Sequence, residues 1–308
     1  MALTINTNIS SLVAQKNLTR ATNGLNNAIE RMTTGYKINK ASDNAAGYSI
    51  AKNWEVKLSS LDIAADNAAT GSDLLATLED NYNLISSHMQ RVRDLTEQAA
   101  NGTYGTASKD AIESEIKARL EEVNRISANC EFNDIYLMNG NSTLTTNGLT
   151  FQVGLDGSTN SKIKLEGIFS AATVVSLFTN RDTGKMDDDD PVALTEAQAS
   201  VANVAKFCSG KGAAAEFSAS EMLDAIDGVI NELSSRITKI GAASNRIDSA
   251  IESISVQSEN ITSSLSTLRD ADIASESSKY IQAQILQQAA STLLSTANQT
   301  PSIALNLL

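Results

Sequence analysis

Proline, histidine and cysteine are scarce in this chain of 308 residues, and each scarcity narrows what the chain can be. Two prolines leave few points at which a long helix would be broken. One histidine, His88, and two cysteines, Cys130 and Cys208, exclude most zinc sites and any dense disulfide framework. Two reduced thiols are expected, although a Cys130–Cys208 bridge stays open. Because no nucleophile–base pair or phosphate loop stands out, we expect neither an enzyme nor a bound cofactor or metal.

Basic residues are also outnumbered, with 24 Lys and Arg against 36 Asp and Glu. The net charge of −12 argues against nucleic acid, because phosphate binding requires a basic patch. No apolar run is long enough to insert into a membrane. The first residues lack the basic and apolar regions of a secretory signal peptide. We therefore expect a protein that stays in the cytoplasm or leaves the cell without a cleaved signal.

The strongest positive signal is a heptad pattern in the C-terminal half, which predicts a long coiled-coil or bundle helix that begins near Ser218. Ser218 and Glu221 have the spacing of a capping box at that start. Alternate steps of three and four residues give Leu223, Ile226, Ile230, Leu233, Ile237, Ile240, Ser244, Ile247, Ile251, Ile254, Ser258, Ile261, Leu265 and Leu268.

The N-terminal half repeats this pattern. One long helix is predicted from the seam of Leu75, Leu78, Tyr82, Ile85, Met89 and Val92. The segment 101–108 contains two glycines and breaks the helix, and a second helix with Ile112, Ile116, Leu120 and Val123 follows. Two apolar-faced helices joined by a short loop predict an antiparallel hairpin.

The centre of the chain changes to a period of two. Residues 149–155 and 163–165 alternate apolar and polar side chains around a turn, which predicts a β-hairpin. Residues 181–191 are acidic and rich in turn formers, and the four adjacent aspartates lack the spacing of a calcium loop, so a solvated loop is expected. Residues 192–215 predict one short helix.

The two ends of the chain carry thin apolar stripes in a background of Asn, Ser, Thr, Gln and Ala. The N-terminal stripe consists of Leu18, Leu25, Ile29 and Met32, and the C-terminal stripe includes Leu286 and Leu293. Each stripe is too narrow to stabilise an isolated helix in water. We therefore expect residues 1–42 and 269–308 to be disordered in the monomer and to become ordered when something covers the stripes.

Motifs at both ends resemble bacterial flagellins. The N-terminal signature is similar in Ile5-Asn-Thr-Asn8, Arg31-Met-Thr-Thr-Gly-Tyr-Lys-Ile-Asn39 and Ser42-Asp-Asn-Ala-Ala-Gly47. The C-terminal signature is similar in Ala283-Gln-Ile-Leu-Gln-Gln-Ala289, Ala297-Asn-Gln-Thr-Pro301 and Leu305-Asn-Leu-Leu308. The final leucines, Leu307 and Leu308, are kept, whereas the arginine that often ends the family is missing.

The resemblance implies a mainly α fold, an elongated helical bundle formed by both chain ends. Residues 1–42 with 269–308 would form an inner coiled-coil domain. Residues 43–166 with 218–268 would form a helical rod with a β-hairpin, and 167–217 a short variable surface segment. The stripes, with Leu307 and Leu308, would be the assembly residues.

The implied function is self-polymerisation into the extracellular flagellar filament that drives swimming. The implied partners are further copies of the chain, the hook-associated junction and cap proteins, and an export chaperone at the C-terminal arm. A hook–filament junction protein is the alternative, and would not polymerise alone. The sequons at Asn101 and Asn141 leave glycosylation open.

The resemblance further implies recognition by Toll-like receptor 5 of an animal host. Its family contact region corresponds to Gln90, Arg91 and Leu95, with Glu115 on the next helix. Arg91 and Leu95 are i,i+4 neighbours, and Leu95 and Glu115 are equally far from the loop between the helices. An alternative use of this patch is packing between subunits.

Overall fold

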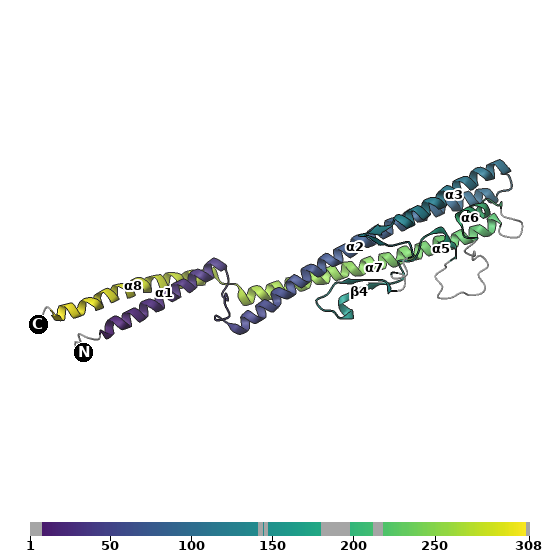
Figure 1. The fold of residues 1–308 in the computed structure, drawn as a ribbon. Coiled ribbons are helices and arrows are strands. Elements are labelled where there is room, and N and C mark those ends of the chain that lie inside the picture. The colour runs from purple at the N-terminus through teal and green to yellow at the C-terminus, as the bar shows by residue number, and fades with distance from the viewer. Residues whose placement is uncertain (1–7, 141–143, 145–146, 180–197, 212–217, 306–308) are drawn as a thin grey trace. The chain divides into compact units, whose positions relative to one another are not determined.

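The computed structural model describes residues 8–140, 144, 147–179, 198–211 and 218–305, with side chains up to residue 299 (Figure 1). The chain divides into two compact units. One comprises Met1–Ser59 and Gln257–Leu308, and we call it the terminal unit. The other comprises Ser60–Val256, and we call it the central unit. The described part is mainly helical with two small antiparallel strand pairs, which confirms the predicted fold class.

The terminal unit contains α1 (Ile9–Thr34) and α8 (Ile273–Leu305), which lie side by side (Figure 1). Asn8 caps α1, because its side chain accepts a hydrogen bond from the amide of Ser11 at 3.1 Å. Gly35 ends α1 in the left-handed conformation, with φ of 75°, as a C-terminal glycine commonly does. Asp272 caps α8 by accepting from the Ala274 amide at 3.0 Å.

Backbone hydrogen bonds join the segment that follows α1 to the segment that precedes α8. The amide of Lys37 donates to the carbonyl of Arg269 at 2.7 Å, and the amide of Ala271 donates to the carbonyl of Gly35 at 2.8 Å. Tyr36 and Asp270 form an isolated antiparallel bridge. The segments that follow α1 and precede α8 are therefore held to one another by their backbones.

The central unit is built on α2 (Ala45–Ala100) and α7 (Ala219–Arg269), which both begin or end in the terminal unit. All six residues of the predicted α2 seam are almost completely buried. On α7 every seventh seam residue is buried, namely Ile226, Leu233, Ile240, Ile247 and Ile254. Ser218 and Glu221 form the predicted capping box, in which Glu221 accepts from the Ser218 amide at 2.7 Å. The heptad prediction is thus confirmed for both helices.

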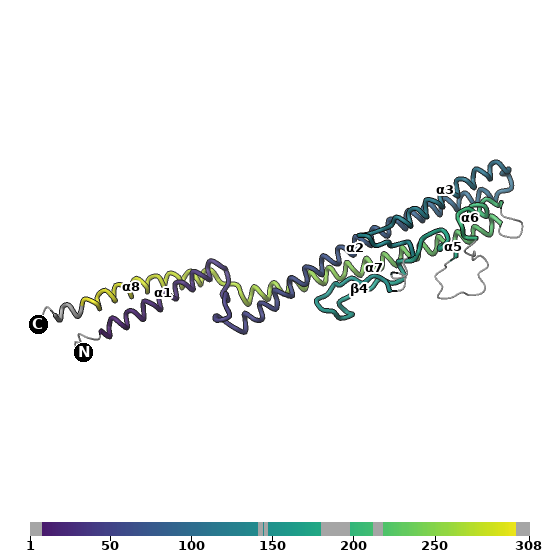
Figure 2. The backbone as a smooth tube through the Cα atoms, viewed as in Figure 1, coloured from purple at the N-terminus to yellow at the C-terminus, as the bar shows by residue number. Residues whose placement is uncertain are grey.

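The remaining elements of the central unit lie along part of these two helices (Figure 2). Helix α3 (Thr106–Asn129) follows a short turn after α2, as predicted. The predicted hairpin is present as β3 (Leu149–Gln152) and β4 (Lys162–Leu165). The two strands are antiparallel, and Leu149 pairs with Leu165. Gly71 of α2 gives this hairpin room, because a Cβ there would lie 3.2 Å from the Phe151 ring.

Some elements differ from the prediction. A second hairpin, β1 (Glu131–Phe132) and β2 (Ile135–Tyr136), turns through Asn133 and Asp134, which both have positive φ. Helix α5 (Val174–Thr179) was not predicted, and the 3₁₀ turn η1 (Thr159–Ser161) precedes β4. The short helix expected within 192–215 is α6 (Val201–Cys208). The acidic loop 181–191 lies outside the described residues.

Both cysteines are free and buried, in agreement with the reduced thiols expected from the sequence. Among the described residues, no helix is both long and apolar enough to cross a membrane. Over the same residues, no group of three or more His, Cys, Asp and Glu side chains is arranged to hold a metal ion.

Candidate assembly and receptor surfaces

The contact between α1 and α8 uses small side chains on α1. Ala14, Ala21 and Ala28 recur every seven residues and are the buried residues of this helix. Leu18, Leu25 and Met32 alternate with them in steps of three and four, and are half-buried. Small residues in a helix seam let two backbones approach closely, and the larger leucines fill the space between them.

The facing seam on α8 is more polar. Its buried or half-buried positions are Glu276, Tyr280, Ala283, Gln287, Ala290, Leu294 and Ala297. The Gln287 amide donates to the Thr22 hydroxyl at 3.2 Å, and the Asn8 amide donates to the Ala297 carbonyl at 2.7 Å. Near the other end of the seam, Arg31 lies 3.5 Å from Glu276. These contacts fix an antiparallel register in which low residue numbers on α1 face high ones on α8.

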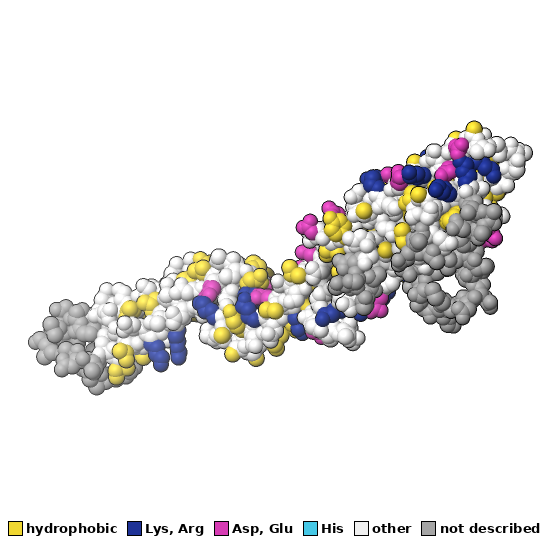
Figure 3. All heavy atoms as spheres, turned by 45° about the vertical axis from the view of Figure 1, so that its right-hand side comes forward, with side chains coloured by type: hydrophobic (Ala, Val, Ile, Leu, Met, Phe, Trp, Pro, Cys, Tyr) yellow, Lys and Arg dark blue, Asp and Glu magenta, His cyan; other side chains and the backbone are white. Residues whose placement is uncertain are grey.

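Several large apolar side chains of this helix pair remain outside the seam. Leu286 and Leu293 on α8 are 52% and 63% exposed, and Leu12 on α1 is 70% exposed. The space-filling view likewise shows hydrophobic side chains at the surface among the charged and polar ones (Figure 3). The exposed members of this set are Ile9, Leu12, Val13, Ile29, Ile273, Ile281, Ile285, Leu286 and Leu293. They form apolar faces that a single helix pair leaves in contact with water.

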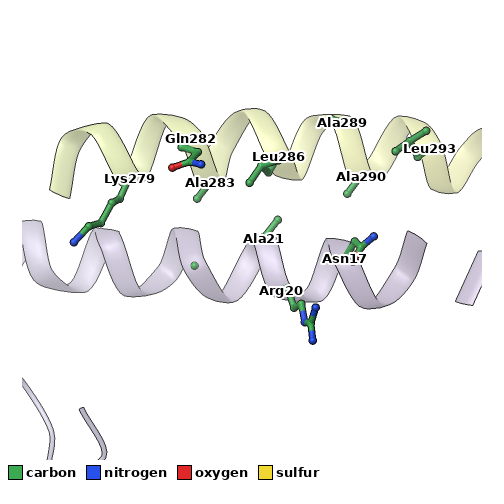
Figure 4. Close-up of a pocket in the computed structure, with 11 residues that line it drawn as sticks. Asn17, Arg20, Ala21, Lys279, Gln282, Ala283, Leu286, Ala289, Ala290 and Leu293 are labelled. Atoms are coloured by element: carbon green, nitrogen blue, oxygen red, sulfur yellow. The ribbon is translucent and has the colours of Figure 1, made fainter. Parts of the chain in front are cut away.

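A groove of about 580 Å³ runs along one of these faces (Figure 4). Leu286, Ala290 and Leu293 line it from α8, and Asn17, Arg20 and Ala21 line it from α1. Its lining is mostly apolar with two basic and two amide side chains, Arg20, Lys279, Asn17 and Gln282, which suits the side of another amphipathic helix.

The predicted assembly residues therefore fall into two groups. Leu18, Leu25 and Met32 lie in the contact between α1 and α8, whereas Ile29, Leu286 and Leu293 are exposed. Leu307 and Leu308 lie outside the described residues. The alanine heptad of α1 was not predicted, because the predicted stripe there consisted of large aliphatic residues, although the spacing of seven is present in the sequence.

The structure brings together two of the predicted receptor residues. Atoms Nη2 and Nε of Arg91 lie 2.9 and 3.0 Å from Oε1 of Glu115, and Arg119 lies 3.8 Å from the same oxygen. Gln90 is exposed beside them. Leu95 is 2% exposed and belongs to the apolar core, so it does not extend this surface as a free apolar anchor. Spacing of i,i+4 places two residues on one face of a helix, but it does not say whether that face is covered.

A buried polar cluster in the central unit was not foreseen. Arg236 is 2% exposed and lies on α7 in a second buried stripe, at heptad spacing from Met222 and Val229. Its guanidinium donates to the Ala171 carbonyl at 3.1 Å and to Glu232 at 2.7 Å, and it lies 6.0 Å from the centroid of the Tyr82 ring. The sequence offered no signal for this cluster, because an arginine in a polar-rich helix is ordinarily solvated.

The single histidine and both cysteines have pKa values shifted by burial. Burial raises the pKa of the Cys130 thiol to about 11 and that of Cys208 to about 12. Burial also lowers the pKa of His88, and the positive charge of Arg119 acts in the same direction. The cysteines are therefore protonated at neutral pH and unreactive as nucleophiles.

Comparison with known proteins agrees with the architecture. Residues 5–143 match the bacterial flagellin N-terminal helical region, and residues 223–308 match the bacterial flagellin C-terminal helical region. Flagellin B of Vibrio cholerae serotype O1 is 31% identical, with all of both chains covered. Flagellin of Bacillus subtilis is 31% identical with 99% of each chain covered, and polar flagellin F of Vibrio parahaemolyticus is 28% identical with all of both covered.

The two matched regions contain the paired terminal helices, all of α2 and α3 and nearly all of α7, so they cover the elements that carry both candidate surfaces. The segment between them contains the two hairpin strands β3 and β4 and the short helices α5 and α6. The chain belongs to the bacterial flagellin family, whose members are structural subunits of the flagellar filament.

Proposed function

We propose that this chain polymerises with copies of itself into a flagellar filament that serves swimming motility. The observation that carries the proposal is the pair α1 and α8, which leaves apolar side chains such as Leu286 and Leu293 exposed beside a groove. A contact between different faces of identical subunits does not close on itself and generates a helical filament. Burial of apolar area at about 25 cal/mol per Å² supplies the driving force.

The arrangement of the chain in the filament follows the family. Residues 1–42 with 269–308 would form the inner domain, residues 43–166 with 218–268 the rod, and residues 167–217 the surface. The terminal helices would be disordered in the free chain and become ordered on assembly, because their seam contributes few large apolar contacts per residue. Such coupling would prevent polymerisation before export, which would proceed without a cleaved signal and end outside the cell.

Electron microscopy of salt-precipitated protein tests the proposal directly. Leu286→Asp combined with Leu293→Asp should abolish filaments, because both side chains stay exposed when α1 and α8 pair, and the substitutions place charge on the apolar face that a neighbouring copy would cover. Gln284→Asp adds a charge at an exposed position of the same helix and should still polymerise. Deletion of residues 269–308 should leave a soluble helical chain without filaments. Filaments from the double variant or from the deletion would refute the proposal.

The resemblance supports further partners: the hook-associated junction and cap proteins at the filament ends and an export chaperone on the C-terminal arm. The exposed apolar residues of α8 would supply the chaperone contact. A hook–filament junction protein is the second candidate, since it would share the paired ends. Polymerisation of the purified chain on its own distinguishes the filament subunit from the junction protein.

Recognition by Toll-like receptor 5 is the second proposed property. Its support is the surface formed by Gln90, Arg91 and Glu115, where a guanidinium and a carboxylate are both partly exposed and paired. Arginine is frequent at the centre of protein interfaces. Leu95 would contribute from beneath this surface, by fixing α2 in place. In a reporter-cell assay, Arg91→Ala should weaken activation, whereas Lys117→Ala, at an exposed position nearby, should not.

A further inference from the structure

The sequence contains asparagine followed by glycine at positions 23, 101, 139 and 147. The asparagine of this dipeptide can deamidate without an enzyme when the glycine amide nitrogen attacks the carbon of the asparagine side-chain amide. The reaction requires a backbone that is free to adopt the attacking conformation, and glycine gives that freedom because it has no Cβ. The surroundings of each pair therefore decide whether the reaction occurs in the folded protein.

Three of the four pairs are held in place. Gly24 lies in the interior of α1, where its amide belongs to the helix. The Gly148 amide donates to the Leu144 carbonyl at 2.9 Å. Gly140 has φ of 78° and lies so close to Ala171 that a Cβ would be 3.0 Å from that side chain. Each of these glycines must leave its packed position before its nitrogen can attack.

The fourth pair, Asn101–Gly102, is open. It follows the end of α2 at Ala100, and both residues are exposed. A Cβ built on Gly102 would meet no atom within 4 Å, so packing does not confine this residue. The neighbouring Asn101 amide donates to the Gln98 carbonyl at 3.2 Å, and the Asn101 carbonyl accepts from the Tyr104 amide at 3.4 Å, both at the exposed end of the helix. The Thr103 amide donates to Oδ1 of Asn101 at 3.2 Å. This hydrogen bond polarises the side-chain carbonyl and holds it over the turn that contains Gly102.

We propose that Asn101 is a site of spontaneous deamidation in the folded protein. The Gly102 nitrogen would bond to Cγ of Asn101 and lose its proton to solvent. The bond between Cγ and the side-chain nitrogen would break, and ammonia would leave, which forms a succinimide. Water would then open the ring at either carbonyl to give aspartate or isoaspartate, with no oxidation or reduction.

The product would place a new carboxylate at the C-terminal end of α2. That end already carries Asp94 and Glu97, and a helix C-terminus disfavours negative charge. Isoaspartate would in addition lengthen the backbone by one atom in the turn that joins α2 to α3. The modification would therefore accumulate with the age of the protein and would loosen the tip of this helical hairpin.

The test incubates the purified full-length chain at mildly alkaline pH and measures the four asparagines by peptide mass spectrometry over time. Labelling by an isoaspartyl methyltransferase identifies the isoaspartate product. Conversion at Asn101 should exceed that at Asn139 and Asn147 by at least about tenfold, because those two pairs lie in the central unit and require local opening. In denaturant the four rates should become similar, which shows that the difference arises from the fold.

Two variants give matched controls at an exposed site that the fold does not depend on. Gly102→Ala should slow conversion several-fold, because Gly102 does not have positive φ and a Cβ there meets no neighbour, so only the attack is hindered. Asn101→Gln should remove the reaction, since the longer side chain forms its ring slowly. The proposal is overturned if Asn101 in the folded chain converts no faster than Asn139 and Asn147, or if Gly102→Ala leaves the rate unchanged.

Discussion

The guanidinium of Arg269 lies 4.1 Å from the centroid of the Tyr36 ring, so the last residue of α7 stacks on the segment that follows α1. The same guanidinium forms an ion pair with Glu55 of α2. The Arg269 carbonyl also accepts a hydrogen bond from the Lys37 amide, so the two backbones are joined at the same place. One side chain thus holds three segments of the terminal unit together.

Arg269→Ala should loosen this junction by about 1–2 kcal/mol, because it removes both the stacking and the ion pair. Arg269→Lys should give an intermediate loss, since an ammonium keeps the charge but lacks the planar face. Hydrogen exchange at the Lys37 and Ala271 amides measures the effect, as both bond across the junction. Unchanged protection at these amides in Arg269→Ala would contradict the assignment.

The same junction should respond to acid through Glu55. A hydrogen bond from Lys52 lowers the pKa of Glu55 below its ordinary 4.5, and the charge of Arg269 acts in the same direction. A lowered carboxyl pKa stabilises the fold above the ordinary value, and this contribution is lost as the pH falls through the folded value. Amide chemical shifts of Lys37 and Arg269 should therefore be constant above pH 4.5 and move below it. Glu55→Gln should suppress that movement.

The cluster of Tyr82 and Arg236 predicts two different losses of stability. The Tyr82 hydroxyl donates to the Ile168 carbonyl at 3.1 Å, so Tyr82→Phe should cost about 1 kcal/mol. Arg236→Met should cost about 3 kcal/mol, because it leaves Glu232 and the Ala171 carbonyl without their donor. Urea unfolding measures both. Arg125→Met removes an exposed pair with Glu122 and should change stability by less than about 1 kcal/mol.

The buried thiols should resist alkylation in the folded chain. The thiolate is the reactive form, and pKa values of about 11 for Cys130 and about 12 for Cys208 leave very little of it near neutral pH. Treatment with iodoacetamide should leave the mass of the native protein unchanged. After unfolding in guanidinium chloride both cysteines should react, and rapid labelling of the native chain would show that one of them is accessible.

The sequence predicted the long helices because heptad spacing marks a buried helix face and does not depend on which helix packs against it. The α7 seam through Ile226 and Leu233 is buried whichever helix lies against it, and Ser218 and Glu221 set its start from local geometry alone. The turn at Asn133 and Asp134 was missed because strands of two residues show no alternation.

The candidate surfaces were less accessible to sequence reasoning than the helices. Leu95 and Leu286 are both apolar residues in amphipathic helices, yet the first is buried and the second is exposed. That difference arises from long-range packing, which residue spacing does not contain. Arg236 is a similar case, since its burial depends on carbonyl groups more than 60 residues earlier in the chain. The local pattern therefore predicts which helix faces are apolar, and tertiary packing determines which of these faces stay exposed.

The alanine seam of α1 gives the last prediction. Ala28 is 3% exposed against α8, so Ala28→Leu would force the two backbones apart and should cost about 1–3 kcal/mol in the paired state. Because that pair would be completed on assembly, the variant should need a higher protein concentration to polymerise. Ala274→Leu makes the same change at an exposed position of α8 and should polymerise as the unaltered chain does. Sedimentation of filaments across a concentration series measures the difference. Equal critical concentrations for the two variants would mean that close approach along the seam contributes little to assembly.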